Sequence, residues 1–199
     1  MYSDVEIKLK KKNKILFSRD SKCLQDLIKL IEMQNHRTLV VWVLDCAKTT
    51  LAQFEAKYPN ELRPRTALEL CETWSRGKIK MPIAKRAILD AHAVAKEIND
   101  DEYGALSHAI GHAGASVHVE THAIGLAIYE LSGIILKYGR EEYQKPVSEK
   151  IDYYCQCLLY WQENTDKLVY EWADFLADDT RPNKERLLNE KRKLKQQGL

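Results

Sequence analysis

The side chains best suited to chemistry are histidines, four of which fall within fifteen residues: His108, His112, His118 and His122. They form two pairs with a spacing of four residues, which places side chains on one face of an α-helix and lets two imidazoles bind one metal ion. Glu120 or Asp45 could complete such a site. Because the residues between the histidines are mostly small or apolar, we expect buried imidazoles at the centre of the fold.

The spacing alone does not identify a metal site. A metalloprotease helix has glutamate directly after its first histidine, whereas Ala109 follows His108 and Val119 follows His118. Buried histidines in an Ala/Gly-rich core more often donate to a backbone carbonyl or to a carboxylate of a neighbouring helix. We therefore predict structural histidines without a metal or cofactor. The alternative is a small helical metal-binding protein or hydrolase that uses these four side chains.

Asp45 interrupts an apolar helical pattern that begins at Trp42. An ionised carboxylate is costly there unless it is paired, so we expect an arginine or histidine partner. The predicted buried polar cluster comprises Asp45, Arg63, Arg65, His112, His118 and His122. Replacing Asp45 or His118 with alanine is then expected to cost on the order of 2–4 kcal/mol, because a buried partner would be left unpaired.

No nucleophile accompanies these groups, so no catalytic residue is predicted. Ser107 and Ser116 lack a Gly-x-Ser-x-Gly context, and no cysteine lies within a few residues of a histidine. The five cysteines are odd in number and lack Cys-x-x-Cys spacing, which argues against a disulfide framework and a zinc knuckle.

A second group of candidates is aromatic and lies in the C-terminal third: Tyr153, Tyr154, Tyr160, Trp161, Tyr170 and Trp172. Their helical spacing favours core packing. However, rings occur on more than one helix face and stand near acids such as Glu163, Asp166 and Glu171, as in a protein-binding face. Both interpretations stay open.

The elements that position these residues are predicted to be helical, giving an all-α single compact domain of seven or eight helices. Ser21 and Asn35 bound the first predicted helix, and Pro64 and Pro82 suit the first turns of later ones. A short connection at 117–120 places the next helix antiparallel to its predecessor, and a long helical stretch over 146–178 has a break near Asn164. We divide the chain into an N-terminal basic segment (1–20), a helical domain (21–180) and a charged C-terminal tail or helix (181–199). Alternating residues near the start suggest a short β-hairpin or a disordered segment.

The net charge of +2 hides an uneven distribution. Residues 1–14 hold five basic and two acidic side chains, residues 181–199 hold seven and two, and residues 15–180 hold 19 and 25. An acidic body and lysines without interleaved aromatic residues argue against nucleic-acid binding. No apolar run has the length of a membrane span or the form of a signal peptide, so we expect a cytoplasmic protein with no membrane partner.

Short motifs in matching order resemble the immunity-protein-5-like family of bacterial polymorphic toxin systems. They are Trp42-x-x-Asp45-Cys-Ala, Phe54-x-x-x-Tyr-Pro59, Arg63-Pro-Arg65, Trp74-x-x-Gly77, Gly111-His-Ala and His118-Val-x-Thr-His122-Ala-x-Gly125. The resemblance covers about residues 38 to 138. It implies an all-helical cytoplasmic protein that binds and neutralises a cognate toxin without catalysis. A further interpretation is a helical scaffold that self-associates as a homo-oligomer through its Ala/Gly-rich helices.

Overall fold

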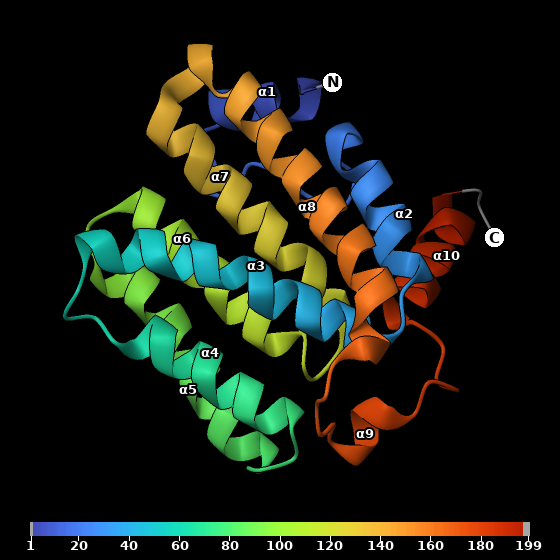
Figure 1. Ribbon diagram of the computed structural model, residues 1–199. Helices are drawn as coiled ribbons and strands as arrows, with labels where there is room; N and C mark the ends of the chain where they lie inside the picture. The colour runs from blue at the N-terminus through green and yellow to red at the C-terminus, as the bar shows by residue number, and fades with distance from the viewer. Residues whose placement is uncertain (1, 197–199) are drawn as a thin grey trace.

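The computed structural model describes residues 2–196, which form an all-α structure of ten α-helices without a strand. Three short 3-10 helices, η1 (Lys22–Leu24), η2 (Glu120–His122) and η3 (Thr165–Lys167), connect them (Figure 1). The α-helices are α1 (Ser3–Lys10), α2 (Gln25–Met33), α3 (His36–Lys57), α4 (Arg63–Ser75), α5 (Met81–Glu97), α6 (Asp101–Ala115), α7 (Ala123–Glu142), α8 (Gln144–Asn164), α9 (Asp174–Ala177) and α10 (Lys184–Gln196).

The predicted all-α class is confirmed, with a few more helices than the seven or eight expected. The predicted N-terminal hairpin or disordered segment is wrong, because residues Ser3–Lys10 form α1. Acids occupy the first turn of α1 and lysines the last, which matches the helix dipole. Val5 is fully buried in the core, and Asp4 accepts a 2.5 Å hydrogen bond from Ser21.

Helix α6 is the centre of the fold, since it packs against α3, α4, α5 and α7. Its buried residues are all small or aliphatic, so its neighbours approach closely. A Cβ placed on Gly111 would lie 2.6 Å from the ring of His92 on α5, and one placed on Gly114 would lie 2.7 Å from the Sγ of Cys71 on α4. Glycine is needed at both positions because no larger side chain fits.

Local sequence signals set several helix ends. Pro64 and Pro82 lie in the first turns of α4 and α5, and Gly77 follows α4 with a φ of 71°. Asp100 caps α6 by accepting from the backbone N–H of Tyr103. Asn35, predicted to end a helix, caps the next one instead, since its side chain accepts from Thr38 N–H at 2.8 Å.

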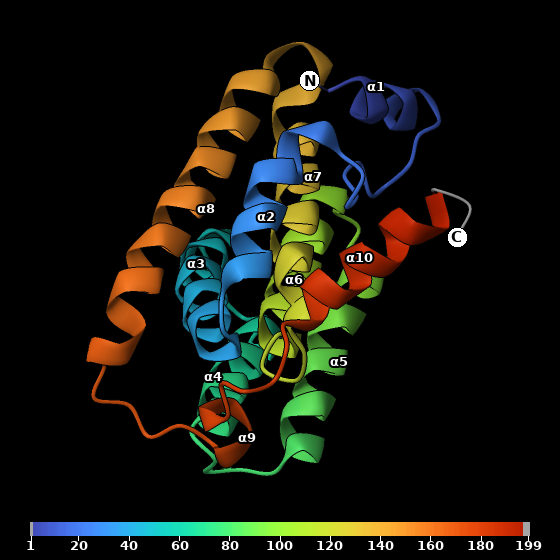
Figure 2. The ribbon, with the colours of Figure 1, turned by 90° about the vertical axis from the view of Figure 1, so that its right-hand side faces the viewer.

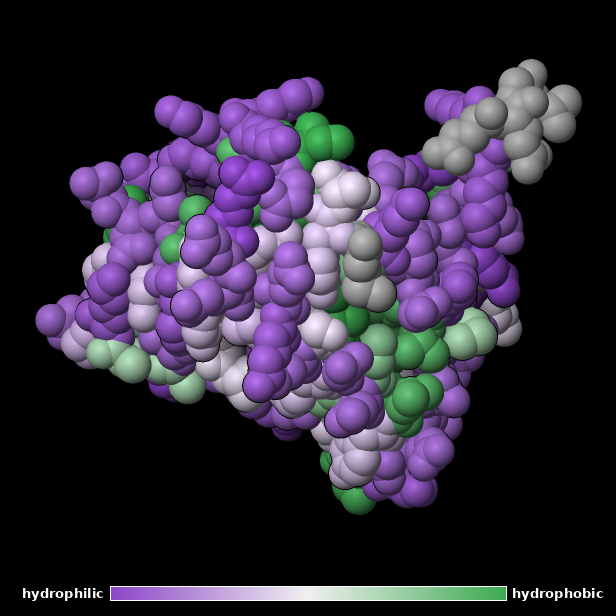
Figure 3. All heavy atoms as spheres, turned by 90° about the horizontal axis from the view of Figure 1, so that it is seen from above, coloured by the Kyte–Doolittle hydropathy of each residue, from purple (hydrophilic) through white to green (hydrophobic). Residues whose placement is uncertain are grey.

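The two ends of the chain cover the bundle on one side. Figure 2 shows α10 crossing beside α2, with α8 on the opposite side of α2. Arg19 joins the ends, because its guanidinium pairs with the buried carboxylate of Glu185 at 2.7 Å and donates to the carbonyl of Thr121 in η2. The end of the molecule near α1, shown in Figure 3, is mostly hydrophilic. Within residues 2–196, no helix is long and apolar enough to cross a membrane.

Candidate functional site

Four imidazole rings meet between α5, α6 and η2, and we call them the histidine cluster: His92, His108, His112 and His122. The Nδ1 atoms of His92 and His108 are 2.8 Å apart, and those of His112 and His122 are 3.4 Å apart. The rings of His92 and His112 join the two pairs edge to face, with centroids 5.3 Å apart. Within each pair, one ring donates its N–H to the unprotonated nitrogen of the other.

Helix α7 covers the cluster with an aromatic ring and a glycine. The Tyr129 ring stacks on His112, with centroids 4.9 Å apart, and lies equally close to His108. A Cβ placed on Gly125 would lie 2.5 Å from the Nδ1 of His112, so only glycine lets α7 approach α6 here. The cluster is therefore held from three sides by close packing.

Burial keeps the cluster uncharged. It lowers the pKa of His112 to about 3 and that of His92 to about 4, and the neighbouring imidazoles add to both shifts. The pKa values of His108 and His122 are also lowered, with burial as the main cause. Groups with such low pKa values carry few protons at neutral pH and are weak general bases.

Two cavities flank the cluster. The larger, of about 630 Å³, is bounded by His112, His122 and Tyr129 on one side and by Arg19 and Arg192 on the other. Both arginines are already ion-paired, Arg19 with Glu185 and Arg192 with Asp20. The smaller cavity, of about 280 Å³, is bounded by His92, His118, His122 and the side chains of α5. His122 therefore separates the two spaces.

The structure brings together only three of the four histidines that the sequence analysis singled out. His108, His112 and His122 come together, but His118 lies in the exposed connection before η2 and stacks on Trp74, with centroids 6.2 Å apart. The four clustered rings are half-buried rather than fully buried, and they contact one another instead of carbonyls or carboxylates. Among residues 2–196, no three His, Cys, Asp or Glu side chains are placed to hold one metal ion.

Sequence reasoning missed His92 as the fourth member of the cluster. It lies on α5, sixteen positions before its contact His108, so no local spacing connects the two. The available signal was Gly111, because a glycine in mid-helix indicates that a bulky neighbour approaches closely.

Asp45 does not pair with an arginine or a histidine. It is half-buried and accepts a 3.0 Å hydrogen bond from the indole N–H of Trp161 on α8, with the thiol of Cys157 3.8 Å away. Arg63 pairs instead with Glu61 and Glu97, and Arg65 with Glu55 and Glu69. The residues predicted as one polar cluster therefore lie in separate places, because α4 presents both arginines to acids at the surface.

A buried polar network that was not predicted is centred on Glu130 of α7. Its carboxylate is 3% exposed, accepts hydrogen bonds from Thr50 and Tyr154, and pairs with Lys150 at 2.8 Å. These contacts tie α7 to α3 and α8. A glutamate within the apolar run of α7 was the signal in the sequence, as Asp45 was in α3.

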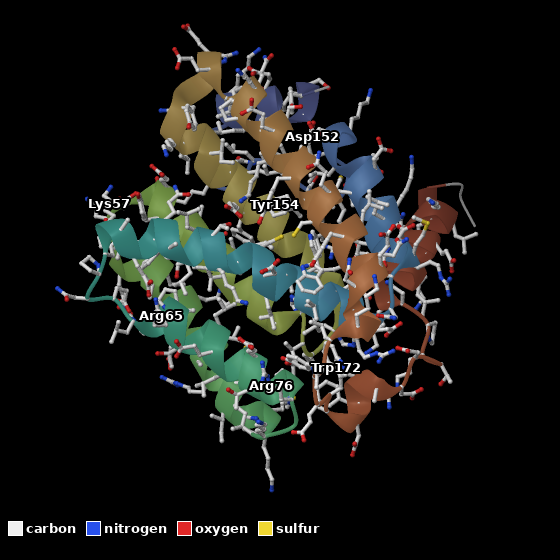
Figure 4. All side chains as sticks on the ribbon, viewed as in Figure 1. Lys57, Arg65, Arg76, Asp152, Tyr154 and Trp172 are labelled. Carbon is white, nitrogen blue, oxygen red and sulfur yellow. The ribbon has the colours of Figure 1, made fainter. Side chains whose placement is uncertain are left out.

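One side of α8 is exposed and rich in rings, and we call it the α8 face: Asp152, Tyr153, Gln156, Leu159, Tyr160 and Glu163. The spacing of these residues follows the helical repeat. Tyr160 is 57% and Leu159 45% exposed, whereas Tyr154 faces inward and is fully buried. Figure 4 shows Asp152 on this helix and Trp172 further along the chain, beside α9. The aromatic set thus divides between core and surface.

The acidic excess of the body is concentrated in the same part of the chain. Residues 149–179 contain eight acidic and two basic side chains, whereas residues 15–148 contain 17 of each. Asp152 and Glu163 form no ion pair in the structure, and one of the two lysines, Lys150, is paired with buried Glu130. The α8 face is thus negatively charged as well as aromatic.

The fold and these sites define a helical protein with an uncharged histidine centre and an acidic, aromatic outer helix. The chain belongs to the family described as Imm-5 like putative immunity protein, whose model matches residues 29–157. This confirms the resemblance seen in the sequence motifs, and the match includes the histidine cluster, Glu130 and the first half of the α8 face, up to Gln156. No curated protein and no solved structure matches the chain.

Proposed function

We propose that this protein is a non-catalytic immunity protein that binds and neutralises a cognate bacterial toxin of a polymorphic toxin system. The observation that carries the proposal is membership of the immunity family over residues 29–157. The low pKa values of the histidines support a role in binding rather than catalysis, because these groups lack the proton affinity that a base needs at neutral pH.

The α8 face supports the choice of binding surface. Exposed tyrosines such as Tyr153 and Tyr160 are the side chains that protein interfaces favour, since they bury a large area at a small entropic cost. Asp152 and Glu163 flank them and form no ion pair with any of the residues 2–196. A toxin domain with a basic patch would complement this face, and the attraction would accelerate association.

The basic C-terminal helix does not oppose such an encounter. Helix α10 carries most of the C-terminal positive charge and lies on the other side of α2 from α8 (Figure 2). This positive charge is thus separated from the α8 face, and α8 can attract a cationic partner.

The test is binding to the toxin domain encoded beside this gene, measured as association rate and affinity, together with protection of cells that express the toxin. The double variant Asp152→Lys/Glu163→Lys reverses both charges of the α8 face and is expected to slow association at low salt by at least about tenfold. Tyr160→Ala is expected to weaken binding by about tenfold through faster dissociation.

Matched controls separate this surface from general charge effects. Glu141→Lys/Glu142→Lys reverses two exposed acids at the end of α7 and is expected to leave the association rate within about twofold of the wild type. Tyr138→Ala removes another exposed tyrosine, 43% accessible, and is expected to bind normally. If the wild-type chain neither binds nor protects against the toxin, the immunity function is refuted. If the control pair slows association as much as the α8 pair, only the choice of face is refuted.

A further inference from the structure

The larger cavity beside the histidine cluster has the size and the lining of a small-molecule site. Its volume of about 630 Å³ lies within the range of ligand pockets, roughly 300–1,000 Å³. The apolar part of its lining comes from three separate segments and comprises Ile15, Phe17, Ile128 and Leu188. A ligand with an apolar body would bind here by removing this surface and its own from water.

The polar part of the lining carries two arginines whose donors are only partly used. Arg19 donates from Nε and Nη2 to Glu185 and from Nη2 to the carbonyl of Thr121, so its Nη1 has no partner in the described part of the chain. Arg192 donates from Nη2 to Asp20. Because a guanidinium offers five N–H donors, both side chains can still bind an acceptor.

The two ion pairs differ in how easily a ligand can open them. The carboxylate of Glu185 is 1% exposed, so it stays on Arg19. Asp20 is 67% exposed, and such a surface pair with Arg192 contributes little stability, so a ligand carboxylate can replace Asp20 there. Since only one of the two cations becomes available, the cavity suits a monoanion better than a dianion such as phosphate.

The histidines on the opposite side of the cavity add one donor and one acceptor. The Nδ1 atoms of His112 and His122 face each other at 3.4 Å, so one proton lies between the two neutral rings. The ring with this proton has a lone pair at Nε2, and the other ring has its own proton at Nε2. Neither Nε2 atom has a hydrogen-bond partner among residues 2–196, so both are available to a polar group of a ligand.

We propose that this cavity binds a small organic monocarboxylate with an apolar body, and that the ligand takes the place of Asp20 on Arg192. Its carboxylate also accepts from Nη1 of Arg19, and its apolar body lies against Ile128 and Leu188. The site shares no residue with the α8 face and does not depend on the immunity function.

The test is a titration of the folded full chain with 3-phenylpropanoate, followed by NMR spectroscopy. The expected dissociation constant is about 1 mM or lower, as for a good ligand of this size. Nuclear Overhauser effects from the phenyl ring to the methyl groups of Ile128 and Leu188 are expected to locate the probe in the cavity. No binding, or contacts only with methyl groups elsewhere, would overturn the proposal.

Related probes test the chemical class of the ligand. The neutral 3-phenylpropanamide has nearly the same shape and is expected to bind at least about tenfold more weakly, because it lacks the charge. Butyrate lacks the ring and is expected to bind at least about tenfold more weakly as well. Equal affinity of either compound would refute the class, and so would displacement of 3-phenylpropanoate by an equal concentration of inorganic phosphate.

Variants assign the carboxylate to Arg192. Asp20→Asn removes the competing acid and is expected to tighten binding of 3-phenylpropanoate about threefold, a gain that misfolding cannot produce. Arg192→Gln is expected to weaken it about tenfold. Arg186→Gln is the matched control, since it changes an exposed arginine of the same helix that pairs with Glu190, and it should stay within about twofold of the wild type. Unchanged or weaker binding in Asp20→Asn, or equal losses in the two arginine variants, would overturn the proposal.

Discussion

The histidine cluster and the α8 face are both rich in rings, yet they differ in charge and in the direction of their polar groups. In the cluster, four imidazoles turn toward one another and are kept neutral by burial. On α8, Tyr160 and the carboxylates of Asp152 and Glu163 are exposed to solvent, and these two acids form no ion pair within residues 2–196. Groups that are satisfied internally contribute to the fold, whereas unsatisfied groups at the surface are free to meet a partner. This chain contains both regions, so they can be tested in one protein.

The largest effect on stability is expected at Glu130, whose contacts with Tyr154 and Lys150 hold α8 against α7. Glu130→Ala removes the partner of Lys150 and Tyr154 and is expected to lower the free energy of unfolding by about 3 kcal/mol, because a partly buried cation loses its counter-charge. Urea denaturation measures the change. Glu142→Ala, an exposed acid on the same helix, should stay within about 0.5 kcal/mol of the wild type.

Adding one methyl group at Gly125 would break the close packing of the cluster. In Gly125→Ala the new Cβ would meet the ring of His112 at 2.5–2.9 Å, which we expect to cost about 2 kcal/mol in thermal or urea unfolding. Gly133→Ala is the matched control on α7, since its Cβ would have ordinary contacts of 3.4 Å or more. The control is expected to be neutral or slightly stabilising through better helix propensity. Equal losses at both positions would contradict the close-packing argument.

Acid should destabilise the histidine cluster. The pKa of His112 is lowered to about 3 in the folded chain from an ordinary value of 6.5, so the unfolded state binds more protons between these values. Stability is therefore full above pH 6.5 and falls as the pH decreases, by roughly 1–2 kcal/mol at pH 5 for this histidine. Unfolding free energies measured at pH 7 and pH 5 give the change.

A variant assigns that pH dependence to the cluster. His112→Gln cannot take up the proton and should lose less stability between pH 7 and pH 5 than the wild type. An unchanged slope in His112→Gln would show that other groups cause the acid loss.

A smaller effect is expected at Asp45, beneath the edge of the α8 face. Asp45→Ala leaves the indole N–H of Trp161 without its acceptor and is expected to cost about 1 kcal/mol, since the site is half-buried. Asp45→Asn retains an acceptor and should cost less. A loss of several kcal/mol in Asp45→Ala would instead fit the buried ion pair that the sequence suggested.

The smallest effect on stability is expected on the α8 face itself. Tyr160→Ala should change the free energy of unfolding by less than about 0.5 kcal/mol, because more than half of this side chain is exposed. Tyr160→Ala would then leave the fold intact and still weaken toxin binding, unlike the changes in the histidine cluster, which lower stability. A large loss of stability in Tyr160→Ala would place this ring in the core.

The helical class and several helix ends follow from local signals in the sequence. Pro64, Pro82 and Asp100 mark helix starts by restricting or capping the backbone, and these signals act over a few residues. The prediction for the start of the chain was wrong because Val5 and Ile7 alternate with polar residues, which is typical of a strand. In the structure this segment is helical and packs Val5 against the core.

The candidate site could be predicted only in part, because its contacts join distant segments. His108 and His112 are found by spacing, but His92 reaches them from another helix. Asp45 was recognised as a costly carboxylate, yet its partner Trp161 is 116 positions away and the sequence does not specify it. Local patterns thus identify which polar groups need partners, and the packing of helices selects those partners.

Arg19 has a practical consequence for anyone who trims the protein to its family core. It lies before residue 29, where the family match begins, and its partner Glu185 lies after residue 157, where the match ends. Removing either flank would widen the larger cavity and expose more of His112 and His122 to water. A shortened version would thus show faster amide hydrogen exchange around η2, although every residue of the family match would remain.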